Sequence, residues 1–90
     1  NETRAVQAIL SQFGRLRITC PVYMKYRWYE PDRRRDKDNV SSFGRKVIQD
    51  SLVQAKVLKN DGWKEITGFR DDFFVDRKNP RIEVEIEEVV

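Results

Sequence analysis

Residues 15–29 read RLRITCPVYMKYRWY, and this stretch decides the fold because apolar and polar side chains alternate along it. A period of two predicts a long β-strand with one buried face. Pro21 has no backbone N–H to give to a neighbouring strand, so we expect an edge position or a bulge there. The apolar set is Leu16, Ile18, Cys20, Val22, Met24, Tyr26 and Trp28.

The segments on either side of this strand have a helical period. Residues 5–13 place four apolar side chains at i, i+3, i+4 and i+7, and Gly14 follows as a C-terminal stop. Residues 30–37 are polar and contain Pro31, which predicts a loop. Residues 39–58 carry a second apolar stripe and predict a longer helix. The two stripes are Val6, Ile9, Leu10 and Phe13, and Val40, Phe43, Val47, Ile48, Leu52, Ala55 and Leu58.

Two further strands are predicted over residues 66–77 and 81–90, with Asn79-Pro80 between them. Asn60-Asp61-Gly62 marks a tight turn ahead of the first. The order helix, strand, helix, strand, strand predicts one small α+β domain, α/β-like in character, with a mixed sheet packed against helices.

Composition excludes several classes of protein. The 90 residues contain no histidine, which excludes a Ser-His-Asp triad and a histidine-ligated zinc site. Cys20 is the single cysteine, so no intrachain disulfide can form, and a cytoplasmic setting is expected. No apolar run approaches the roughly 20 residues needed to span a bilayer. We expect neither a membrane association nor a small-molecule cofactor.

Positive charge is concentrated in the middle of the chain. The net charge is +3 and the sequence pI is about 9.2. Residues 25–46 hold eight basic side chains against four acidic ones, whereas residues 81–90 hold one basic against four acidic. The middle segment is therefore where a polyanion could be received.

The motif Asp36-Lys37-Asp38-Asn39 places two carboxylates two residues apart where the loop meets the second helix. In extended backbone such residues point the same way, so both could face one Mg²⁺ ion. The alternative is that Asp38 or Asn39 is a helix N-cap in a surface loop of alternating charges. Asp61 is likewise either a metal ligand or a turn residue.

The constellation resembles the RusA family of Holliday junction resolvases, in which Asp-x-Asp-Asn opens a helix and an acidic residue follows it in a tight turn. The matching segments are Asp36-Lys37-Asp38-Asn39, residues 47–52 (VIQDSL), Asn60-Asp61-Gly62-Trp63 and residues 79–86 (NPRIEVEI). The resemblance runs from about Arg15 to the C-terminus, and the Asn-Asp-Gly-Trp turn is close to the variant found in prophages of Gram-positive bacteria.

This resemblance implies a homodimeric, Mg²⁺-dependent endonuclease that cuts branched DNA. It implies that Asp36, Asp38 and Asp61 form the metal-binding cluster and that Asn39 shapes the helix start. Ser42 stands where the family has a lysine, so Lys46 is the candidate for that role and Arg45 is its rival. The family strand and loop ahead of the first helix are not visible, so residues 1–90 are expected to lack them.

With no histidine and no evident nucleophilic side chain, the expected attacking group is metal-activated water. Each basic residue has a plainer alternative as a solvated surface charge, and the aromatic residues can stack on bases or pack in the sheet. The rival functions are a non-catalytic DNA-binding module of the same fold and a small protein-interaction domain. The side chains expected to contact DNA are Arg33, Arg34, Arg35, Lys37, Asn39 and Arg45, and the aromatic set is Tyr26, Trp28, Tyr29 and Trp63.

Overall fold

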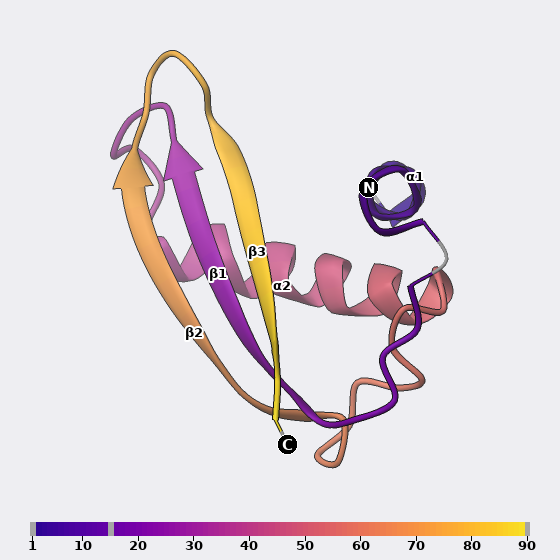
Figure 1. Cartoon of the computed structure of the whole chain (residues 1–90). Helices are drawn as coiled ribbons and strands as arrows, with labels where there is room; N and C mark the ends of the chain where they lie inside the picture. The colour runs from indigo at the N-terminus through magenta and orange to yellow at the C-terminus, as the bar shows by residue number, and fades with distance from the viewer. Residues whose placement is uncertain (1, 15, 90) are drawn as a thin grey trace.

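The computed structural model describes residues 2–14 and 16–89, which form two helices and three strands. The elements are α1 (Glu2–Phe13), β1 (Val22–Glu30), α2 (Lys37–Gln54), β2 (Ile66–Val75) and β3 (Arg81–Glu88) (Figure 1). This order confirms the predicted α+β class. Among the described residues, no helix combines the length and the apolar character that crossing a bilayer requires.

β1 is the central strand of a sheet with the order β2-β1-β3. β2 runs parallel to β1 and β3 runs antiparallel to it, so the sheet is mixed, as predicted. Parallel neighbours need a crossover connection, and α2 supplies it between β1 and β2. The segment after β1 and the segment before β2 therefore lie at opposite ends of the sheet (Figure 1).

The alternation in β1 builds the core. Val22, Met24, Tyr26 and Trp28 are at most 2% exposed, and they pack with apolar residues of α2 such as Leu52. The prediction of one buried face is confirmed over these residues, and Tyr26 and Trp28 are packing residues rather than exposed rings.

The two large β1 rings also carry polar contacts to α2 and β2. Trp28 Nε1 donates to Asp71 Oδ1 at 3.0 Å, and Gln49 Nε2 donates to Tyr26 Oη at 3.0 Å. Burial raises the pKa of Tyr26 to about 12. Gly44 lets α2 approach closely, because a Cβ built there would lie 2.6 Å from Cζ3 of Trp28.

α1 packs against α2 and ends as predicted. Gly14 has a φ of +60°, and its N–H donates to the carbonyl of Leu10 at 2.9 Å, as in a left-handed C-terminal cap. Val6, Ile9 and Phe13 pack against the core, whereas Leu10 is 43% exposed. Three of the four residues in the predicted apolar stripe thus face inward.

The strand predicted over residues 15–29 is too long at its start, because β1 begins only after Pro21. Ile18 makes an isolated parallel bridge to Leu58, and Arg15 lies outside the described residues. The expected edge position at Pro21 is wrong because β1 is central, but the ladder to β2 does shift register between Val22 and Tyr23.

The second helix also differs from its predicted span of 39–58. It begins at Lys37 and gives way at Ala55, after which Lys56 adopts a left-handed φ of +64°. The N–H groups of Val57 and Leu58 both donate to the carbonyl of Leu52. Turning the chain here buries Val57 and Leu58 in the core, which offsets the strain of a non-glycine residue at positive φ. β2 ends at Val75 and β3 at Glu88, both two residues short of prediction, and Val90 lies outside the described residues.

Candidate functional site

The loop that joins β1 to α2 is held by two local contacts. The guanidinium of Arg35 donates twice to the carboxylate of Glu30, with both hydrogen bonds at 2.9 Å. The backbone N–H of Arg34 donates to the carboxylate of Asp32 at 2.9 Å. A bidentate arginine contact fixes orientation as well as position. This loop therefore delivers Asp36 to the start of α2 in a defined place.

Asp36 is the N-cap residue of α2, but its side chain makes no capping hydrogen bond. Its backbone is extended, and its carbonyl accepts from the N–H of Val40 at 3.0 Å. Asp38 lies within the first helical turn. The expected extended backbone through both residues is therefore wrong, because Asp38 is helical. The alternative that Asp38 or Asn39 is the N-cap is also wrong, because Asp36 holds that position. Both carboxylates instead stand at the positive end of the helix dipole, which favours negative charge.

Among the residues that the structure describes, these two carboxylates have no hydrogen-bond or ion-pair partner. Most acidic side chains in the described part of the chain accept a hydrogen bond or pair with a cation. Those that do neither are Asp36, Asp38, Asp61 and Glu65. Three of these four are the residues predicted to bind the metal ion. A free, exposed carboxylate keeps its oxygen atoms available to a cation from solution.

A surface hollow of about 770 Å³ adjoins Asp36. It opens where β1 and β2 end and α2 begins, and cations and apolar groups line it together. Arg33 has no ion pair among the described residues, and the ammonium of Lys37 lies 5.6 Å from the ring centre of Phe73. A phosphate group in this hollow would meet cations beside the free carboxylates. The wall also includes Glu30, Asp32, Arg35, Val40, Phe74 and Val75.

Asp61 lies at the other end of the molecule. The N–H of Val22, which begins β1, donates to the carbonyl of Glu65 at 2.8 Å, so this turn adjoins the start of the sheet. α2 has 18 residues, which span about 27 Å. Within the described part of one chain, no three acidic, cysteine or histidine residues come together as a metal site. Asp36 and Asp38 are thus close in the fold, and Asp61 does not join them within one chain.

The turn around Asp61 is itself well ordered by hydrogen bonds. The backbone N–H of Asp61 donates to the side-chain oxygen of Asn60 at 2.8 Å, and the N–H of Ile66 donates to the carbonyl of Gly62 at 3.0 Å. The predicted turn chemistry is therefore present, yet it uses the backbone of Asp61 and leaves its carboxylate free.

The two candidate bases on α2 differ in their surroundings. Lys46 is exposed, and its ammonium contacts Asp50 at 3.3 Å, one turn further along the helix. It follows Asp38 by eight positions, or about 12 Å of helix rise. Arg45 is half-buried, pairs with Asp71 and stacks 4.2 Å from the ring centre of Phe69. Arg45 therefore ties α2 to β2, whereas Lys46 pairs with a residue of its own helix.

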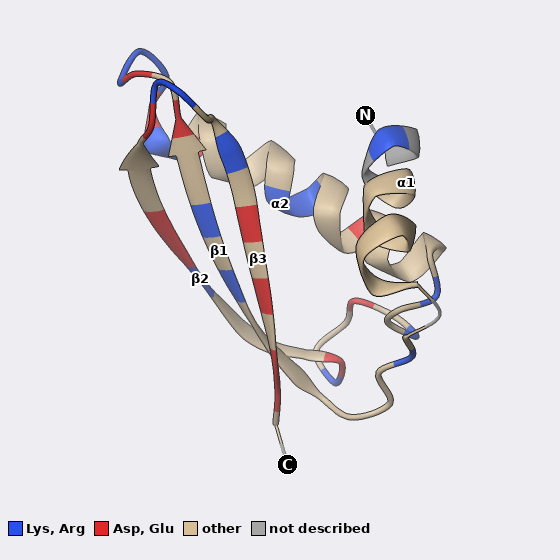
Figure 2. Cartoon of the chain, turned by 45° about the horizontal axis from the view of Figure 1, so that its top comes forward, with Lys and Arg blue, Asp and Glu red and all other residues tan. Residues whose placement is uncertain are grey.

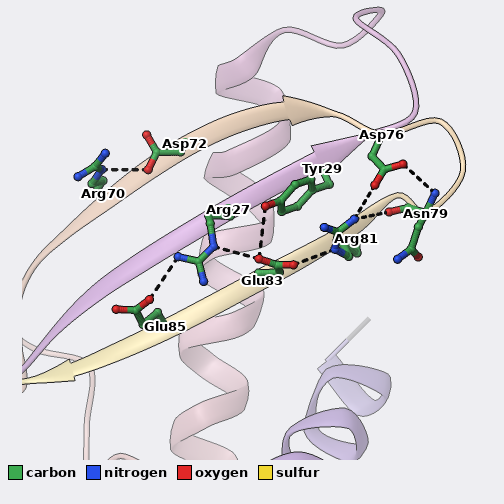
Figure 3. A network of polar contacts seen from close by, with 9 residues as sticks. All are labelled: Arg27, Tyr29, Arg70, Asp72, Asp76, Asn79, Arg81, Glu83 and Glu85. Carbon is green, nitrogen blue, oxygen red and sulfur yellow. Dashed lines mark hydrogen bonds and ion pairs between the residues drawn. The ribbon is translucent and has the colours of Figure 1, made fainter.

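The uncovered face of the sheet neutralises much of the predicted mid-chain positive charge. Arg27 of β1 donates to Glu83 at 3.0 Å and to Glu85 at 3.3 Å, and Arg81 donates to Glu83 at 2.9 Å (Figure 3). Lys25 pairs with Glu87 at 2.8 Å. Figure 2 shows this arrangement as blue bands along β1 beside red bands along β3. The expectation that residues 25–46 present a basic surface is thus corrected.

In the described part of the chain, the basic side chains without a carboxylate partner gather at the two ends of the sheet. Arg33, Lys37, Arg77 and Lys78 lie where β1 and β2 end. Four others lie where these strands begin, and sequence reasoning did not single them out. Within the described residues those four are Arg17, Lys56, Lys59 and Lys64.

Cys20 is a poor nucleophile. Its thiol donates a hydrogen bond to Glu88 at 3.1 Å, and this contact raises the pKa of the thiol. Because the thiolate is the reactive form, a raised pKa leaves little of it at neutral pH. The free carboxylates at the start of α2 are therefore the better candidate site.

The family described as Endodeoxyribonuclease RusA matches residues 3–87. The chain belongs to the RusA family. No curated protein matches the chain. Because RusA proteins are endodeoxyribonucleases, membership supports a hydrolase that acts on the phosphodiester bonds of DNA. The match includes all of α2, β1 and β2 and all but the last residue of β3, and so covers the free carboxylates at either end of the helix.

Proposed function

We propose that this chain is a Mg²⁺-dependent endonuclease that resolves four-way DNA junctions by paired cuts, acting as a homodimer in DNA recombination and repair. The observation that carries the proposal is the pair of free carboxylates, Asp36 and Asp38, at the N-terminus of α2 in a chain of the RusA family. RusA resolvases generally depend on a divalent metal.

Asp36 and Asp38 fit a Mg²⁺ ion. This ion takes one or two protein carboxylates and keeps its other positions for water and phosphate oxygens. Among the described residues neither side chain makes a helix cap or an ion pair, both are exposed, and Asp36 lines the 770 Å³ hollow. The chemistry that bound Mg²⁺ supplies in such sites is activation of water and neutralisation of charge on the scissile phosphate.

Asp61 would reach this site from a second copy of the chain. A two-fold dimer with its α2 helices antiparallel brings the N-terminal end of one helix to the C-terminal end of the other. Phe43 supports such an arrangement, because it is an apolar side chain in the second turn of α2 that is 73% exposed and available to a second copy. Each of the two sites would then contain carboxylates from both copies. Two equivalent sites suit two matched cuts in a junction with near two-fold symmetry.

The basic residues would have separate tasks. Arg33 and Lys37 line the hollow without a carboxylate partner and are the best placed to contact phosphate. Lys46 would stabilise the charge that develops on the phosphate after leaving Asp50. Three arginines would contact DNA only secondarily, because each pairs with a carboxylate of the protein: Arg34 with Asp32, Arg35 with Glu30 and Arg45 with Asp71. Asn39 is exposed next to Asp38 in the first turn of α2.

The test is cleavage of a labelled synthetic four-way junction, with Mg²⁺ or with a chelator, beside a linear duplex of the same sequence. We expect paired nicks in the junction that require Mg²⁺. Asp36→Asn and Asp38→Asn should abolish nicking and preserve binding, because each loses a ligand and also some repulsion of phosphate. Asp72→Asn, on the outer face of the sheet, is the matched control and should cut normally. Wild-type cutting by either α2 variant would refute the site.

A non-catalytic DNA-binding module is the second candidate. Ser42 in the position of the family lysine and the contact of Lys46 with Asp50 favour it. Tight, salt-dependent binding of the junction without Mg²⁺-dependent nicks would establish that function instead.

A further inference from the structure

Trp63 is the most exposed large apolar side chain of the described residues. Its side chain is 98% exposed, whereas the chain's other tryptophan, Trp28, is buried. Of the two alternatives for the aromatic set, packing in the sheet therefore does not apply to Trp63. The hydrogen bonds at Asp61 and Ile66 fix the backbone of its turn, so the indole projects from an ordered support.

Cations flank this turn in the sequence and line two surface hollows. Lys59 and Lys64 line one surface hollow of about 350 Å³, and Lys59 also lines a second of about 340 Å³ together with Arg17 and Lys56. Within the described residues none of these four pairs with a carboxylate. We call Arg17, Lys56, Lys59, Trp63 and Lys64 the Trp63 patch. The acidic side chains nearest to it in sequence or contact are Asp61, Glu65 and Glu88, and Glu88 accepts a hydrogen bond from Cys20.

We propose that the Trp63 patch is a second DNA contact, in which the indole stacks on an unpaired base while the surrounding lysines contact the flanking phosphates. A flat aromatic side chain among unpaired cations is the combination that binds single-stranded nucleic acid without regard to sequence. The centre of a branched junction offers unstacked bases that a linear duplex does not. The inference rests on the proposed function only in taking DNA as the ligand.

The cations favour DNA over a second copy as the partner of Trp63. A protein interface that buried the indole would also bury Lys59 and Lys64, which line the hollow next to the turn. Glu65 lies nearby, but Asp61 of this chain and the free carboxylates that a second copy would bring, Asp36 and Asp38, are the proposed metal ligands. Phosphate supplies the missing counter-charge, and release of its counterions favours binding.

Tryptophan fluorescence tests the inference directly, because Trp63 is exposed and Trp28 gives a buried, constant background. The wild-type protein in chelator is titrated with a four-way junction, a single-stranded oligonucleotide and a linear duplex. We expect quenching by the first two and little by the duplex. Trp63→Ala should remove the quenching and weaken binding of the junction roughly tenfold. Trp63→Phe should restore most of the affinity, because it keeps an aromatic face.

The outcomes separate this inference from the nuclease itself. One outcome is that the junction is bound and cut without a change in fluorescence and that Trp63→Ala keeps full affinity. This result would overturn the stacking inference and leave the proposed nuclease function intact. The tryptophan emission without DNA tests burial between copies. If that emission is already blue-shifted and protected from acrylamide quenching, and more so at higher protein concentration, Trp63 is buried between copies and the stacking inference is overturned. Quenching without Mg²⁺-dependent cuts would support the stacking and refute the nuclease.

Discussion

Mixing two inactive variants gives the sharpest test of a site shared between copies. Mg²⁺ binds its ligands at about 2.0–2.1 Å, so two carboxylates on one ion lie within a few ångströms of each other. Asp38 and Asp61 of one chain are separated by most of the roughly 27 Å length of α2. We therefore expect Asp38→Asn and Asp61→Asn to be inactive alone and to restore activity when combined in one dimer.

The size of the recovery follows from counting sites. Random exchange makes about half of the dimers mixed, and each mixed dimer has one intact site out of two, so about a quarter of wild-type nicking should return. The assay is single-turnover nicking of an end-labelled junction after the two variants are unfolded and refolded together. Asp36→Asn mixed with Asp38→Asn is the matched control, because both changes disable the same end of α2 and no intact site can form.

Two results would refute the reasoning. The first is no recovery from the Asp38 and Asp61 variants although tagged copies are shown to have exchanged. The second is recovery from the Asp36 and Asp38 variants, which would mean that these two carboxylates serve different sites. A third arm, Lys46→Ala mixed with Asp61→Asn, reports which end of α2 the lysine serves: recovery places Lys46 with Asp38.

Three further predictions concern the scaffold. Gly44→Ala should lower the free energy of unfolding by about 1–2 kcal/mol in urea titrations, because overpacking against Trp28 outweighs the gain in helix propensity, and the loss should vanish in a Trp28→Phe background. The pKa of Glu83 is lowered from its ordinary value of 4.5, chiefly by its hydrogen bond from Arg81. Its contribution to stability is therefore present above pH 4.5 and is lost as the pH falls through the lowered pKa. Glu83→Gln should therefore reduce the fall of the thermal unfolding midpoint at acid pH. Ser51→Ala should raise stability by about 1 kcal/mol, because the hydroxyl is fully buried and makes no hydrogen bond among the described residues; a lower urea midpoint would contradict this.

The sequence predicted the order and type of the elements because the patterns of β1 and α2 are strong and local. It missed the end of α2 because no glycine marks it: Lys56 takes the left-handed conformation only because Val57 and Leu58 are pulled into the core. That driving force is tertiary and has no local signature. The strand predicted from residue 15 starts too early, and the cause is local. Pro21 interrupts strand pairing more strongly than the apolar alternation favours it, so β1 begins only at Val22.

The separation of Asp61 from Asp38 was within reach of the sequence. The predicted helix over residues 39–58 was already long enough to hold the two carboxylates apart. What the pattern could not supply was the topology: β2 runs parallel to β1, so α2 crosses the whole sheet before the chain turns at Asp61. Residue types therefore identified the free carboxylates, and only the fold indicated that they belong to two ends.

Charge is where sequence counting failed most clearly, and the reason is register. The antiparallel ladder places Lys25 opposite Glu85 and Arg27 opposite Glu83, so the acidic last strand cancels the basic first one. A count along the chain treats these groups as separate, although the sheet brings them together. Among the described residues, the cations that have no carboxylate partner stand at the two ends of the sheet, beside the free carboxylates of Asp36 and Asp61. Under the proposed function, the surfaces that combine free carboxylates with unpaired cations lie at those ends, and a dimer that joins opposite ends would assemble them into one continuous path for DNA.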